Sequence, residues 1–159
     1  MFPDRTEPES NRRRRPGVIA SALALGVSLI LISGCGDLSH DELNRGVESL
    51  SALAAQGELI ANGVARDATK STYSRVMAKT LGGEAEHEAE KLADAEPEAA
   101  VKSERHAAVQ VAGELASLFS ELQTFPGDEH HGALVEKHLG EVKEQADAIV
   151  ARLNGEPAR

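Results

Sequence analysis

Apolar residues recur every three or four positions through most of the chain after residue 38. This spacing places them on one face of an α-helix, which makes a turn in about 3.6 residues. No stretch of strand length alternates apolar and polar residues, so the pattern predicts an all-α fold. The helical spacing is seen in four stretches, at about residues 39–62, 67–94, 97–123 and 129–153.

The first predicted helix has a clear start. Ser39 and Glu42 have the spacing of a capping box, in which each side chain bonds to the backbone N–H of the other residue. Leu38 and Leu43 stand on either side of the box, where a hydrophobic staple would form. The apolar stripe that continues this helix consists of Leu43, Val47, Leu50, Leu53, Ala54, Ile60 and Val64.

The end of this helix is less well defined. Gly57 and Gly63 both weaken it, because an interior glycine costs about 1 kcal/mol relative to alanine. We expect a turn at 62–67, with Asp67 as the cap of the next helix. In the alternative, the first helix continues with a bend as far as Leu81.

The second predicted helix has a thin, alanine-rich apolar face, and Gly82-Gly83 is expected to kink or end it. The third helix is expected to begin at Pro97, because proline suits a first helical turn. Its stripe includes Leu118, with Phe119 beside it. The stripe of the second helix consists of Tyr73, Met77, Leu81, Ala85, Ala89 and Leu92.

The fourth helix follows the turn at residues 124–128 and ends at Asn154-Gly155. Short connections make consecutive helices antiparallel neighbours, so residues 39–155 are predicted to form an up-down-up-down four-helix bundle, with 156–159 as a tail. The alternative is a three-helix bundle with one long, bent first helix. The stripe of the fourth helix consists of Val135, Leu139, Val142, Ala146, Ile149 and Leu153.

A different pattern precedes the bundle. Four arginines, residues 12–15, lead into an unbroken apolar run, residues 18–32. A membrane-spanning helix needs about 20 apolar residues, whereas the core of a signal peptide needs about 7–15. The small residues Ser33 and Gly34 then provide a site where a peptidase can bind extended backbone. The run therefore predicts a removable signal peptide at residues 1–34.

The end of this segment, Ile32-Ser33-Gly34-Cys35, resembles the lipobox of bacterial lipoproteins. The resemblance implies cleavage between Gly34 and Cys35, diacylglycerol on the Cys35 sulfur and often a further acyl chain on the new amino terminus. Residues 35–38 would then be a short lipidated tether, and the body would be extracytoplasmic, anchored to the cell membrane or the outer membrane. The alternatives are an uncleaved membrane helix and a secretory signal whose cysteine is incidental.

The net charge of the chain limits the classes of molecule that it is expected to bind. Of 17 Lys and Arg and 26 Asp and Glu, five basic and three acidic residues precede Cys35, so residues 35–159 carry a net charge of −11. An acidic surface repels nucleic acid and anionic lipid, so we expect no nucleic-acid binding and a body that stands off the bilayer. The expected partners are the membrane, through the lipid on Cys35, and another envelope protein.

The sequence offers no constellation of catalytic residues, and no serine lies in a G-x-S-x-G elbow. We therefore expect no enzyme activity and no cofactor besides the covalent lipid. The predicted function is an anchored, non-catalytic structural or protein-interaction module.

The alternative function is metal binding through histidine and glutamate. Glu84, His87 and Glu88 share one face of a predicted helix, and His131 and His138 share one flank of another. Di-iron bundles place an E-x-x-H motif on each of two helices, and this chain has only one such motif.

Overall fold

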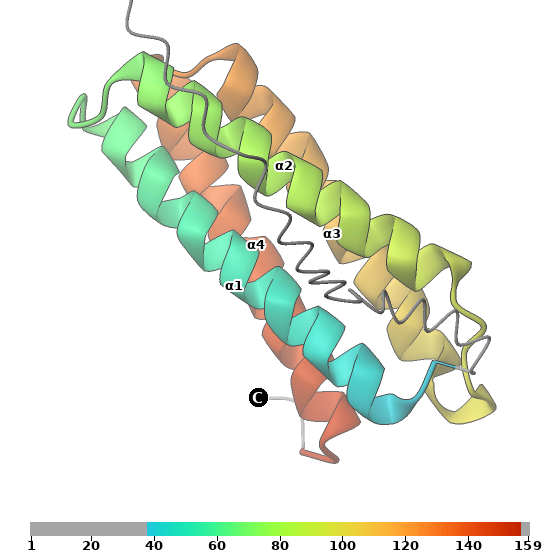
Figure 1. Cartoon of the computed structure of the whole chain (residues 1–159). Coiled ribbons are helices and arrows are strands. Elements are labelled where there is room, and N and C mark those ends of the chain that lie inside the picture. The colour runs from blue at the N-terminus through green and yellow to red at the C-terminus, as the bar shows by residue number, and fades with distance from the viewer. Residues whose placement is uncertain (1–37, 157–159) are drawn as a thin grey trace, which may run out of the picture. The chain divides into compact units, whose positions relative to one another are not determined.

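The computed structural model describes residues 38–156. The predicted signal peptide, with Gly34 and Cys35, lies outside the described residues. Figure 1 shows the helices of the bundle. They are α1 (His40–Ala65), α2 (Ser71–Asp94), the short 3₁₀ helix η1 (Ala99–Val101), α3 (Lys102–Thr124) and α4 (Glu129–Leu153).

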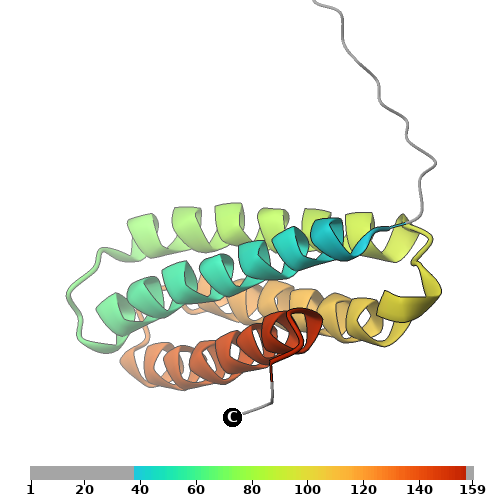
Figure 2. The ribbon, with the colours of Figure 1, turned by 90° about the horizontal axis from the view of Figure 1, so that it is seen from below.

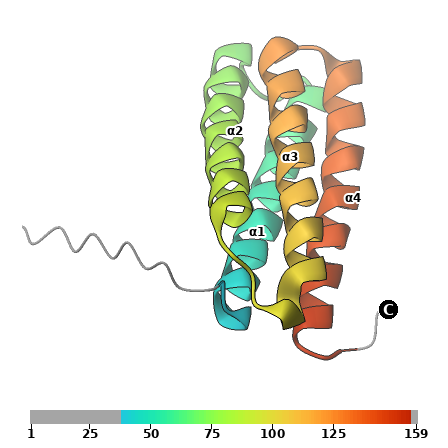
Figure 3. The same cartoon turned by 90° about the vertical axis from the view of Figure 1, so that its right-hand side faces the viewer.

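The four α-helices run side by side, and each is antiparallel to the next along the chain (Figures 1 and 3). This confirms the predicted all-α four-helix bundle. The three-helix alternative is wrong, because α1 ends at Ala65 and the chain reverses before Ser71. Asp67 sits in the reversal with a φ of 50°, a left-handed conformation that stops a helix.

The bundle consists of two closely packed pairs, because α1 packs mainly against α4 and α2 mainly against α3. Glycine permits close approach in the first pair: a Cβ atom at Gly132 would lie 2.7 Å from the backbone nitrogen of Ala65. Gly57 is also buried, and a Cβ atom there would lie 2.5 Å from Cε1 of Phe119. The glycine that weakens α1 locally is therefore needed by the packing.

The hydrophobic core runs the length of the bundle, between the four helices seen in Figure 2. Phe119 is its largest fully buried side chain, at 0 % exposed. The predicted stripe of α3 differs here, because Leu118 is only partly buried and Phe119 takes the central place. The predicted stripe of α4 is confirmed from Val135 to Ile149.

The predicted stripe of α2 is confirmed at Leu81, Ala85 and Leu92, but in the first two turns of the helix the buried face is displaced by one residue. Tyr73 is 55 % exposed and Met77 is only partly buried, whereas Ser74 and Ala78 are buried. These small side chains let α2 pack closely against α3, and the Ser74 hydroxyl is satisfied by donating to the carbonyl of Lys70. Close packing therefore selects the small residues over the large ones.

Three local expectations are wrong. The helix α2 continues without interruption through Gly82-Gly83, because its packing against α3 outweighs the cost of two glycines. Asp67 does not cap it: the cap position is Lys70, which makes no side-chain capping bond. The third helix begins at Lys102 after η1 rather than at Pro97, which forms an isolated bridge with Leu38 instead.

Candidate functional site

The described chain begins with Leu38, three residues after the predicted lipid attachment site. Its N–H donates to the carbonyl of Glu96 at 2.6 Å, and its carbonyl accepts from the N–H of Glu98 at 3.4 Å. Its side chain is 6 % exposed and belongs to the core. Leu38 is therefore held on both its backbone and its side chain by the connection between α2 and α3.

The predicted capping box is present next to this bridge. The Ser39 hydroxyl accepts from the N–H of Glu42, and the Ser39 N–H donates to a Glu42 carboxylate oxygen at 3.1 Å. The Ser39 hydroxyl also donates to this carboxylate at 2.9 Å, and the bonds that the Ser39 N–H and hydroxyl donate lower the pKa of Glu42 below its ordinary value. The junction between the predicted tether and α1 is thus held by hydrogen bonds at Leu38 and Ser39.

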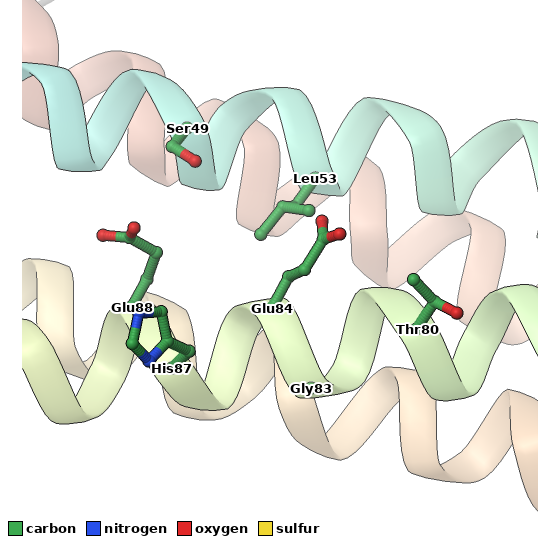
Figure 4. A pocket seen from close by; sticks show the side chains of 7 residues that line it. All are labelled: Ser49, Leu53, Thr80, Gly83, Glu84, His87 and Glu88. Carbon is green, nitrogen blue, oxygen red and sulfur yellow. The ribbon is translucent and has the colours of Figure 1, made fainter. Parts of the chain in front are cut away.

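A groove that contains predicted ligand residues lies between α1 and α2, which pack less closely against each other than α1 packs against α4. It is an open groove of about 470 Å³. Figure 4 shows Glu84 and Glu88 extending from α2 toward α1, while the ring of His87 lies beside α2. The groove is lined by Ser49, Leu53, Thr80, Gly83, Glu84, His87 and Glu88.

Two carboxylates in this groove have different surroundings. The side chain of Glu88 is 17 % exposed and pairs with Lys91, whose Nζ lies 3.4 Å from it. Glu84 is exposed, and His87 is exposed too. The groove therefore contains all three predicted metal ligands of the second helix, but their side chains do not converge on one point where a metal ion could bind.

The predicted pair on α4 does not converge. His131 stacks on Phe125 with ring centroids 4.1 Å apart, and its Nδ1 lies 3.2 Å from a carboxylate oxygen of Asp128. His138 instead lines a shallow hollow between α3 and α4, with Glu114 and Glu141 among its neighbours. The two histidines occupy separate surroundings two helical turns apart.

The contacts of His131 serve the start of α4. Asp128 is the N-cap residue, and its carboxylate accepts from the backbone N–H of His131 at 2.9 Å. This hydrogen bond, more than the nearby ring, lowers the pKa of Asp128 below its ordinary value. Within residues 38–156, no group of three or more His, Cys, Asp or Glu side chains is placed to hold a metal ion.

Several bonds between helices were not predicted from the sequence. Nε2 of His40 lies 2.6 Å from the carbonyl of Leu153, which ties the start of α1 to the end of α4. Asp147 accepts from Lys143 on its own helix and from Ser51 on α1, and these bonds lower its pKa. Of these contacts, only the Lys143–Asp147 pair could be predicted from the sequence, because its residues are four positions apart on one helix.

No helix in the described part of the chain is long and apolar enough to cross a membrane. Comparison with protein-family models, with curated proteins and with solved structures gives no match for this chain.

Proposed function

We propose that the chain is a bacterial lipoprotein held at the extracytoplasmic face of a membrane by lipid on Cys35. Its four-helix bundle acts there as a non-catalytic structural or interaction module that contacts another envelope protein. The proposed membrane location rests on the apolar run at residues 18–32 and on the lipobox resemblance at Ile32-Ser33-Gly34-Cys35. The bundle supplies a folded body directly after that anchor.

One structural observation carries the proposal, namely that Leu38 is already part of the fold. Only Gly36 and Asp37 separate it from Cys35. A lipid on Cys35 would therefore hold the body close to the bilayer rather than at the end of a long linker. Two or three acyl chains anchor a protein far more firmly than one, because each buried methylene contributes about 0.8 kcal/mol.

The interaction role is supported by the nature of the surface. Residues 35–159 are acidic, which favours a body that projects from an anionic membrane. Large apolar side chains remain exposed on several elements of this surface, among them Leu59 on α1 and Leu134 on α4. An anchored bundle of this kind is suited to contacting a protein partner.

Metabolic labelling with a fatty acid tests the anchor in the bacterium. We expect label in the wild-type chain and in Ser33→Ala, which keeps a small residue in the lipobox. We expect none in Cys35→Ser, which lacks the sulfur that accepts the lipid. Absence of label from the wild-type chain, expressed at the same level, would contradict the proposal.

Affinity capture from envelope extract tests the interaction role. The wild-type and Cys35→Ser chains are compared after mild cross-linking, and the retained proteins are identified. We expect a specific partner with the wild-type chain. The interaction role is contradicted if neither form retains one.

A further inference from the structure

One stripe on the exposed face of α2 separates its charges by sign. Arg75 and Lys79 lie in the first half of the helix, and Glu86 and Glu90 lie in the second half. All four side chains are exposed. Positions 75, 79, 86 and 90 recur at helical spacing, so they form one stripe on the outside of the bundle.

The exposed face of α4 is arranged differently. Its opposite charges alternate at four-residue spacing and pair within the helix: Lys137 with Glu141 at 3.3 Å, and Lys143 with Asp147 at 2.7 Å. In the described chain, none of the four charged residues of the α2 stripe makes such a pair.

Like charges four residues apart destabilise a helix. Arg75 with Lys79, and Glu86 with Glu90, are two such pairs. The α2 stripe therefore carries unfavourable repulsion at both of its ends, and opposite charges from outside the molecule would relieve it.

The middle of the stripe is hollow. A Cβ atom added at Gly83 would meet nothing within 4 Å. Gly82 and Gly83 also border a shallow groove of about 230 Å³ between α2 and α3, whose lining includes Lys79 and Glu86. The absence of side chains at these glycines lets another helix approach the backbone of α2 at the centre of the charged stripe.

We propose that this surface binds a second copy of the chain, with the two α2 helices antiparallel and crossing between Gly82 and Gly83. A two-fold axis at that point places Lys79 opposite Glu86 of the partner subunit and Arg75 opposite Glu90 of the partner subunit. The symmetry repeats both pairs, so each sign meets its opposite along the whole stripe. This inference does not depend on the lipid anchor.

Self-association accounts for both halves of the stripe at once. An acidic partner would use only Arg75 and Lys79, and a basic partner only Glu86 and Glu90. In a two-fold symmetric interface the same patch is used by both copies, and a patch with basic and acidic halves on either side of a centre is complementary to itself. The surface area that one pair of helices buries is small compared with the roughly 1,600 Å² of a standard protein–protein interface. We therefore expect the dimer to be weak and to depend on protein concentration.

Analytical ultracentrifugation tests the dimer with charge-reversed variants. The protein is the chain from residue 35 onward with Cys35→Ser, because the described residues 38–156 contain the whole bundle and residues 1–34 are the predicted signal peptide. We expect the wild-type sequence to dimerise between micromolar and millimolar concentration. In R75E/K79E and in E86K/E90K we expect the dissociation constant to rise about tenfold or more, because attraction becomes repulsion at each pair.

Mixing the two variants tests most directly whether opposite charges on the two stripes hold the dimer together. R75E/K79E has an acidic stripe and E86K/E90K has a basic one, so equal amounts should form a mixed dimer at least as tight as the wild type. K137E/K143E on α4 is the matched control, because it makes the same change in net charge as R75E/K79E on another helix. It should leave dimerisation unchanged, and circular dichroism checks the fold of every variant.

Three results would overturn the proposal. The first is a wild-type chain that stays monomeric at millimolar concentration. The second is a dimer whose affinity is the same in R75E/K79E and E86K/E90K as in the wild type, since it would use another surface. The third is a mixture of the two variants that associates no better than each variant alone.

Discussion

The backbone N–H of Leu38 donates a hydrogen bond of 2.6 Å to the carbonyl oxygen of Glu96. The two residues are far apart in the sequence, and the bond joins the segment before α1 to the connection between α2 and α3. Because Leu38 comes so soon after Cys35, a pull on the predicted anchor would act directly on the bundle.

Replacement of Leu38 by alanine should destabilise the bundle by about 2 kcal/mol, because a buried leucine loses most of its apolar contacts. Leu59→Ala is the control, since Leu59 is 77 % exposed on α1 and its loss should cost less than about 0.5 kcal/mol. Urea denaturation followed by circular dichroism measures both. Equal losses would mean that Leu38 is not held by the fold.

Gly57→Ala should destabilise the bundle by about 1–3 kcal/mol, although alanine favours helix, because its Cβ would collide with Phe119. In α3, Gly113→Ala places a Cβ where nothing lies within 4 Å, so it should stabilise by about 0.5–1 kcal/mol. Thermal unfolding of the two variants should therefore shift in opposite directions. A stabilising Gly57→Ala would contradict the observed approach of α1 to Phe119.

Local chemistry predicted the fold where the signal was short-range. The capping box at Ser39 and the turn before Asp128 depend on residues within a few positions of one another, and both are confirmed. The predicted stripe of α2 was wrong only near the start of the helix, at Tyr73 and Met77, because burial there depends on how closely α3 approaches. That long-range packing buries Ser74 and exposes Tyr73, against their hydrophobicity.

The candidate site was partly predictable for the same reason. Helical spacing correctly placed Glu84 and Glu88 on one side of α2, where they line the groove with His87. The same reasoning placed His131 and His138 on one flank, but it could not foresee that His131 stacks on Phe125. Partners on other segments are set by the tertiary fold.

The stability supplied by Asp128 should depend on pH. Its pKa in the folded state is lowered by the N–H of His131, so its contribution is present above the unfolded pKa of about 3.9 and is lost as the pH falls through the lower folded value. Asp128→Ala should therefore lower the thermal midpoint at neutral pH and have little effect in strong acid. Asp128→Asn keeps a capping oxygen and is the control. A deficit independent of pH would contradict this account.

Removal of metal should leave the bundle unchanged. Its stability comes from apolar burial along the four helices, and no three-ligand group lies within the described residues. Thermal unfolding with and without a chelator should give the same midpoint, and calorimetric titration with zinc should show no binding. Heat that disappears in His87→Ala or His131→Ala would contradict this expectation and support the metal-binding alternative.

The central claim, that Cys35 becomes a lipidated amino terminus, is tested most directly by the intact mass of the protein purified from bacterial membranes. We predict a chain that begins at Cys35 and carries the added mass of diacylglycerol, with or without a further acyl chain. Cys35→Ser should lack the lipid mass. A wild-type protein that retains residues 1–34, or that begins elsewhere with an unmodified cysteine, would contradict the account.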